Sequence, residues 1–167
     1  MENIIFRRRS IRRFLDKPVE TEKIERILHA GMQAPSAHNN QRWEFIVVTE
    51  KEKKEALSQM GKWTGMCANA PVVIVVMGKY DNEELNKWLP QDLGACTENI
   101  LLQIVDEELG GCWMGFYPKE DMTEKLREYF KIPQNVMPFG LVALGYSEDK
   151  NIFINRFDAS KIHYNKY

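Results

Sequence analysis

The chain has 167 residues, of which 44% are hydrophobic and 28% charged, and its formal net charge is only -1. These values are typical of a globular domain that buries a sizeable core, and they argue against an intrinsically disordered chain. A sequence pI near 6.3 also disfavours a protein that follows a nucleic-acid backbone, because such proteins usually carry a basic excess over a face or a whole domain.

The cysteines and the apolar runs bear on the compartment. Cys67, Cys96 and Cys112 are odd in number and form no CxxC pair, so the sequence predicts neither a disulfide framework nor a metal site. The first residues lack the apolar stretch of a signal peptide, and the longest apolar run, residues 72–77, is too short to span a bilayer. We therefore expect a cytoplasmic protein with free thiols and no membrane contact.

Helical spacing of apolar residues, or a helix-forming composition, recurs along the chain. The predicted helices cover residues 2–9, 21–34, 50–60, 91–109 and 122–130. The fourth of these differs from the others because its apolar stripe is wider than one face. We expect it to be a central, largely buried helix.

Strands are predicted between these helices. Apolar and β-branched runs of strand length occupy residues 43–49, 72–77, 110–117 and 136–146. Pro138 in the last run suits the start of a strand or an edge strand. No linker, repeat or low-complexity stretch divides the chain. The pattern predicts one α+β domain over residues 1–167, with a mixed central β-sheet, helices on both faces and a polar, aromatic C-terminal arm from about residue 147 to 167.

A run of arginines near the start raises the question of a bound anion. The stretch RRRSIRRF, residues 7–14, places five arginines around Ser10. A basic string alone most often forms a solvated face or a nucleic-acid patch. Three features favour a small phosphate instead: the hydroxyl of Ser10 beside guanidinium groups, the apolar anchors Ile11 and Phe14, and a lone Arg156 among apolar neighbours that could close on the same anion.

Other common catalytic motifs are absent from the sequence. The sequence has no GxSxG, GxxxxGK[ST], GxGxxG or HExxH motif. His29 is interpreted as a structural or surface residue and His163 as a packing residue of the tail, and only His38, in the polar loop after residue 34, is a candidate for ligand contact. Asp92 and Glu98 form no evident acid–base pair, so a structural hydrogen bond or solvation is expected for them. If the chain is an enzyme, its chemistry belongs to a cofactor.

Seven segments together resemble the FMN-dependent nitroreductase family, in particular its short bacterial members. In order, they are RRSIRRF, APSAHNNQRWEF, NAPVVIVV, DLGACTENILLQ, GGCWMGFYP, IPQNVMPFGLVALGY and RFDASKIHYNKY. The resemblance covers nearly the whole chain. It implies a nitroreductase-like three-layer sandwich, assembled as a homodimer with two FMN sites at the subunit interface.

The resemblance also implies roles for the basic residues. Arg8, Arg9 and Ser10 would bind the phosphate and ribityl chain of FMN, and Arg156 would return to the phosphate. Arg12 would lie near flavin N1 and O2, where a positive charge favours the reduced ring. No role is implied for Arg7 or Arg13, and Ile154 stands where larger family members often carry a lysine.

Further contacts to the flavin would come from two backbone segments. The loop of Pro35, Ser36, Ala37, His38 and Asn39 would reach the flavin of the other subunit. Met114 and Gly115 would lie beside flavin N5 and O4, where backbone N–H groups donate hydrogen bonds. Four aromatic residues are candidates for the substrate side, although core or interface packing explains each equally well: Trp63, Trp88, Phe116 and Tyr117.

The implied activity is hydride transfer from NADH or NADPH to FMN and then to a nitroaromatic, quinone or related small-molecule acceptor, in a ping-pong sequence without a covalent nucleophile. Flavin reduction, reductive dehalogenation and flavin breakdown are alternatives on the same fold. A non-catalytic flavin-binding module, or a nucleic-acid-binding module if the arginines face solvent, remains open as well.

Overall fold

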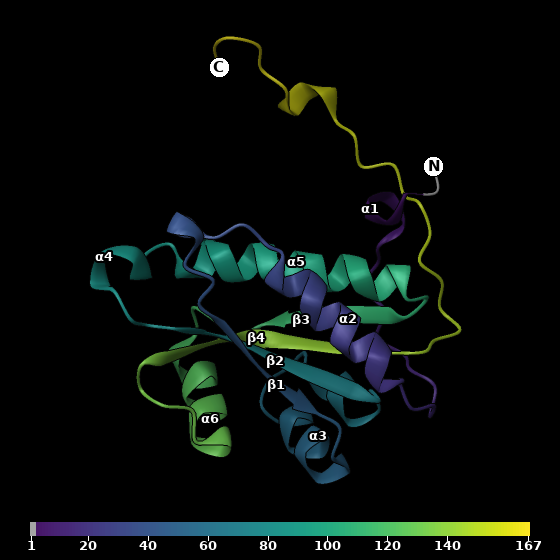
Figure 1. Cartoon of the computed structure of the whole chain (residues 1–167). Helices are drawn as coiled ribbons and strands as arrows, with labels where there is room; N and C mark the ends of the chain where they lie inside the picture. Colours follow the sequence, from purple (N-terminus) through teal and green to yellow (C-terminus); the bar gives the residue numbers. More distant parts are fainter. Residues whose placement is uncertain (1–2) are drawn as a thin grey trace.

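A computed structural model describes residues 3–167 and contains a four-stranded sheet in the order β1-β2-β4-β3. The strands are β1 (Trp43–Val48), β2 (Val72–Lys79), β3 (Gly110–Gly115) and β4 (Val136–Gly145). Figure 1 shows α2 (Thr21–Met32) and α5 (Leu89–Asp106) on one face of this sheet, with α3 (Lys51–Ser58) and α6 (Glu120–Phe130) on the other. The predicted α+β architecture, with helices on both faces, is confirmed.

Two apolar clusters fill the spaces between these layers. Because successive residues of a strand point to opposite faces, Ile74 and Val76 of β2 pack toward α2 and α5, whereas Val73 and Val75 pack with residues of α3 and α6. All eight residues of β2 except Lys79 are buried, as expected for a strand covered on both faces. Since β2 has no polar side, the hydropathy of its residues could not show which side chains face which layer of helices.

The central helix α5 is buried as the sequence predicted. Leu93, Cys96, Ile100 and Ile104 are each 0% exposed, and all belong to the cluster beneath α2. The two helices approach closely at Gly31, where a Cβ atom would lie 2.8 Å from Cγ1 of Ile100. A glycine is therefore required at that crossing.

The pairing of the strands differs in one respect from the expected mixed sheet. All three ladders of the sheet are antiparallel, and within residues 3–167 the parallel pairing is confined to an isolated bridge between Ser10 and Gly111. Strand direction depends on how the connections run across the sheet, and the composition of a strand does not encode it.

Pro138 lies near the start of β4, as predicted, but β4 is an inner strand. A β-bulge accommodates it: Val76 pairs with Gly140 and Met77 with Pro138, so Phe139 is the extra residue. The Phe139 carbonyl accepts hydrogen bonds from the N–H groups of Phe116 and Tyr117, at 3.1 and 3.0 Å.

Several short helices complete the described chain. Helix α1 (Ile4–Arg7) is capped at its N-terminus by Asn3, whose side chain accepts a hydrogen bond from the Ile5 N–H at 2.9 Å. The helix α4 (Glu83–Asn86) was not predicted, and neither were the 3₁₀ turns η1 (Ala37–Asn39), η2 (Gly65–Ala68) and η3 (Ala159–Lys161). Among the helices of residues 3–167, none combines the length and hydropathy that a membrane crossing needs.

The C-terminal segment packs on the N-terminal segment and then leaves the body of the molecule. Ser147 Oγ donates to the Arg13 carbonyl at 2.6 Å, and Asn151 Nδ2 donates to the Leu109 carbonyl at 3.0 Å. Beyond this point large apolar side chains are exposed, with Phe157 74% and Tyr164 80% accessible. Figure 1 shows this final stretch extending past α1, away from the sheet.

Candidate functional site

The arginine segment is fixed to the edge strand β3 by its own backbone. The Ile11 N–H donates to the Gly111 carbonyl at 2.9 Å, next to the bridge between Ser10 and Gly111. Ile11 is 5% exposed and lies so close to Gly110 that a Cβ there would be 2.6 Å from Ile11 Cγ2. The predicted anchoring of the arginines by Ile11 is confirmed, and Gly110 makes it possible.

Three of the predicted phosphate-binding arginines line one cavity of about 480 Å³. Arg8 and Arg9 enter it from the N-terminal segment, and Arg156 enters from the arm. Its apolar walls include Phe6 and Phe153, whose rings meet edge to face with centroids 6.0 Å apart. Residues separated by about the length of the chain thus meet in one cavity.

The electrostatics of this cavity suit an anion. Desolvation lowers the pKa of Arg9, and repulsion from Arg156 and Arg8 lowers it further. Arg9 Nε is buried without a hydrogen-bond partner, as is Nε of the neighbouring Arg7. Arg8 forms an ion pair with Glu98, whose Oε1 lies 3.4 Å from Arg8 Nε, so the role of Glu98 is an ion pair that the sequence did not predict. A phosphate placed among Arg8, Arg9 and Arg156 would relieve the repulsion between them, so these residues fit the phosphate of FMN.

A second cavity of about 470 Å³ contains three more of the residues predicted to contact the flavin. Arg12 lines it together with Met114 and Gly115. A Cβ at Gly115 would meet no atom within 4 Å, so the backbone there is open to the close approach of a flat ring. Cys112 lines the same cavity, and burial raises the pKa of its thiol, while Arg12 and Ser10 act in the opposite direction.

The loop predicted to reach a second flavin lies at a third cavity, of about 380 Å³, which Pro35, Ser36 and Ala37 line. His38 and Asn39 have positive φ angles of 53° and 55°. Such angles are uncommon outside glycine and cluster at functional sites. The three cavities share no lining residue, so a single chain does not bring this loop into the arginine cavities.

A buried ion network that the sequence did not reveal supports this loop. Asp92 Oδ1 accepts from the Ala37 N–H at 3.0 Å, so the predicted structural hydrogen bond of Asp92 is confirmed. Arg42 Nη2 lies 4.0 Å from Asp92 Oδ2 and donates to the Leu85 carbonyl at 2.9 Å. Arg42 also pairs with Asp81 at 3.2 Å. Both members of the central pair are less than 10% exposed.

The remaining arginine and the aromatic residues named from the sequence lie at different places in the structure. Arg13 pairs with Asp149 through two contacts, the longer of which is 3.0 Å, and so ties the arm to the N-terminal segment. Trp63 is 70% exposed and lines the Arg12 cavity, where Phe116 also contributes although it is 0% exposed. Trp88 lines the loop cavity instead.

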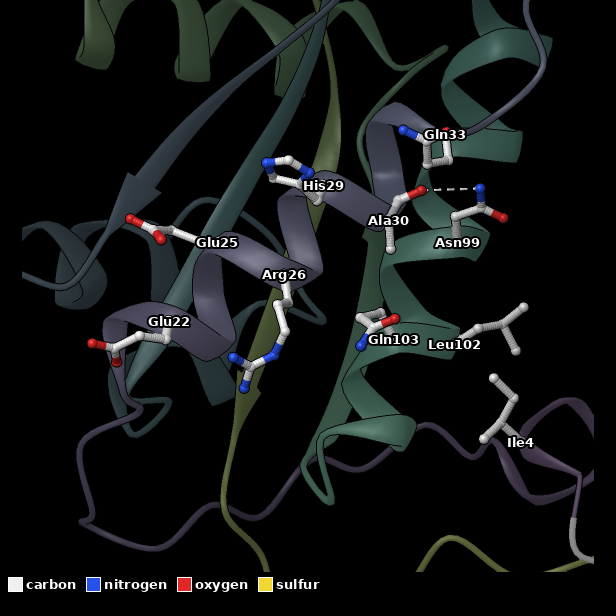
Figure 2. A pocket seen from close by; sticks show the side chains of 10 residues that line it. All are labelled: Ile4, Glu22, Glu25, Arg26, His29, Ala30, Gln33, Asn99, Leu102 and Gln103. Atoms are coloured by element: carbon white, nitrogen blue, oxygen red, sulfur yellow. Dashed lines mark hydrogen bonds between the residues drawn. The ribbon is translucent and has the colours of Figure 1, made fainter.

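A further cavity, larger than these three, contains none of the predicted site residues. It is an open groove of about 790 Å³ between α2 and α5. Figure 2 shows Ile4 beside Leu102 at one end, and the hydrogen bond from Asn99 Nδ2 to the Ala30 carbonyl, of 3.1 Å, at the other. His29 lies on its α2 side and is exposed, which agrees with its interpretation as a structural or surface residue.

Comparison with known proteins identifies relatives along the whole chain. The family model described as Nitroreductase family matches residues 5–63 and 58–146. A protein of Archaeoglobus fulgidus that carries the name NADH dehydrogenase/NAD(P)H nitroreductase is 40% identical over 169 residues, which cover 98% of this chain and 97% of that protein.

Solved structures of similar proteins support the same family. A crystal structure from Clostridium acetobutylicum, named as an NADH oxidase, has a TM-score of 0.96 at 42% identity and covers 99% of this chain and 100% of that one. An FMN-dependent nitroreductase from Clostridium difficile R20291 has a TM-score of 0.91 at 32% identity, with 100% of both chains covered. The chain belongs to the nitroreductase family.

Proposed function

We propose that this chain, with FMN bound, transfers a hydride from NADH or NADPH to a nitroaromatic, quinone or related small-molecule acceptor. The observation that carries the proposal is the cavity of Arg8, Arg9 and Arg156, in which three guanidinium groups meet with one nearby carboxylate. The relatives named as an NAD(P)H nitroreductase and an FMN-dependent nitroreductase support the donor and the cofactor. The free cysteines favour a reducing, cytoplasmic setting.

The residues of the chain would bind and orient the cofactor. Arg8, Arg9, Ser10 and Arg156 would hold its phosphate and ribityl chain by charge-assisted hydrogen bonds. When bound, FMN supplies the group that accepts a hydride and gives it up. Arg12 would place a positive charge at the pyrimidine edge of the ring, and the open backbone at Gly115 would leave room for the ring. N–H groups of Met114 and Gly115 would donate hydrogen bonds to it.

We further propose that the site is completed by a second copy of the chain. The loop of residues 35–39 has a strained backbone and a buried support, yet it lies at a cavity of its own within one chain. The groove between α2 and α5 and the exposed side chains of the arm offer surface for such a partner (Figure 2). A homodimer would bring the loop of one subunit to the flavin of the other.

The space in the cavity beside Gly115 bears on the order in which donor and acceptor bind. The cavity beside Gly115 would admit donor and acceptor in turn, so the first product leaves before the second substrate enters. Double-reciprocal plots should then be parallel. Stopped-flow measurements should show bleaching of the flavin by NADH or NADPH, and its reoxidation by a quinone or a nitroaromatic, as separate reactions.

The same measurements distinguish the alternatives. Intersecting plots would contradict the shared cavity. A flavin that dithionite reduces but no nicotinamide reduces would overturn the reductase proposal and favour flavin breakdown or a non-catalytic flavin-binding role.

A further inference from the structure

The cavity beside Gly115 has walls suited to a flat aromatic compound. Its apolar lining comes mainly from Trp63, Met66, Trp113, Met114, Phe116 and Met122. Trp63 is 70% exposed, so its ring is available to a ligand and is not part of the core. Aromatic rings and methionine side chains provide broad, adaptable contacts for planar ligands.

The polar lining of this cavity has one sign of charge. Arg12, Lys62 and Lys119 contribute three cations, and no aspartate or glutamate is among the lining residues. Throughout residues 3–167, no carboxylate lies within ion-pair distance of any of the three. The groove between α2 and α5 differs, since Glu22 and Glu25 line it. A cavity lined by one sign of charge attracts ligands of the other sign.

Two of these cations are not needed for the proposed cofactor. Arg12 would face the flavin, which leaves Lys62, before η2, and Lys119, immediately before α6. Both side chains are exposed, and they reach the cavity from different elements. The Lys62 ammonium lies 4.9 Å from the centroid of the Trp63 ring, so a charge and an aromatic surface adjoin at the same wall.

We propose that this cavity selects planar aromatic acceptors that carry a negative charge, and that Lys62 and Lys119 determine this specificity. The inference rests on the proposed function. For a nitroaromatic carboxylate the reaction is R–NO₂ + NAD(P)H + H⁺ → R–NO + NAD(P)⁺ + H₂O. Two electrons from the nicotinamide reduce the nitro group, one N–O bond breaks, and the oxygen leaves as water.

The test compares 4-nitrobenzoate with 4-nitrobenzamide, which are similar in shape and differ in charge. With the FMN-loaded protein, kcat/KM should be about five-fold higher for the benzoate at low salt, because exposed charges contribute only modest attraction. The preference should shrink at high salt, where exposed charges are screened. The variant K62Q/K119Q should lose the preference. The matched control K125Q/K131Q, which removes two exposed lysines at and just after α6, outside the cavity, should retain it.

A binding measurement keeps this inference separate from the proposed function. Quenching of tryptophan fluorescence by the two compounds, without any nicotinamide, should show the same charge preference in the parent and its loss in K62Q/K119Q. If the parent turns over neither compound and also fails to reduce a quinone, the proposed function fails and the binding result alone decides the charge preference. Equal binding of both compounds by the parent would overturn the inference. An unchanged preference in K62Q/K119Q accompanied by a raised KM for NADPH would also overturn it, because the lysines would then serve the donor.

Discussion

Removal of single arginines tests whether the cavity between the N-terminal segment and the arm holds a phosphate. Arg8→Ala and Arg156→Ala each delete one guanidinium from its lining. Arg13→Ala is the matched control, because Arg13 lies in the same sequence run but pairs with Asp149 outside this cavity. All three substitutions remove the same charge, so a general electrostatic effect would act on each of them alike.

The magnitude follows from the kind of contact that is lost. A hydrogen bond to a charged group contributes about 1.5 to 3 kcal/mol, which corresponds to a loss of about 10- to 150-fold in FMN affinity for each cavity arginine. The apoprotein should respond differently. Desolvation lowers the pKa of Arg9, and repulsion from Arg156 and Arg8 lowers it further, so removing Arg156 relieves repulsion and should not reduce the stability of the apoprotein. Removing Arg8 also relieves repulsion but breaks its ion pair with Glu98.

In the assay FMN is titrated into each apoprotein and binding is detected by the quenching of flavin fluorescence. Riboflavin, which lacks the phosphate, is titrated in the same way for comparison. The parent and Arg13→Ala should prefer FMN over riboflavin to the same extent. Arg8→Ala and Arg156→Ala should lose much of that preference while binding riboflavin as the parent does. If Arg13→Ala lost FMN while the two cavity variants kept it, the phosphate assignment would be refuted.

Two further predictions concern stability. Gly110→Ala should lower the free energy of unfolding by about 1 to 3 kcal/mol, because the new Cβ would lie 2.6 Å from an Ile11 methyl group. The control Gly65→Ala should change it by less than about 0.5 kcal/mol, because its Cβ would meet no atom within 4 Å. Urea titration measures both free energies, and equal effects would contradict the packing argument. Burial raises the pKa of Cys67 and Cys96 from 9.0 to about 12, so the stability that their neutral thiols contribute is intact below about pH 9 and is lost as the pH rises toward 12. At pH 10 the titration of each thiol should lower the free energy of unfolding by about 1 kcal/mol relative to pH 7.5. Cys96→Ala should therefore lose less stability between pH 7.5 and 10 than the parent. An identical loss would show that Cys96 does not titrate in this way.

The parts of the fold that the sequence predicted are those with local signals. The breadth of apolar residues over 91–109 predicted a buried helix, and its inner residues from Leu93 to Ile104 are fully buried in α5. Ile11 beside the arginines predicted an anchor, and it packs against Gly110. Both signals arise from the spacing of side chains along a few turns or residues, which sequence periodicity reports directly.

The parts that escaped prediction depend on contacts between distant segments. Arg42 and Asp92 are separated by fifty positions in the chain and meet only after α5 has packed beside the loop at residues 35–39. The bulge at Phe139 depends on register with β2, which Pro138 alone does not specify. The same holds for the tie between Arg13 and Asp149, since an exposed arginine carries no local sign of its partner.

Sedimentation velocity monitored at the visible absorbance of the flavin tests the central claim most directly, because it reports cofactor binding and assembly together. If the chain binds FMN at a site completed by a second copy, the flavin should sediment with a species of twice the 19.6 kDa of one chain. Flavin that sediments with a 19.6 kDa species would contradict the shared site. Flavin that stays unsedimented while the protein moves away from it would contradict FMN binding itself.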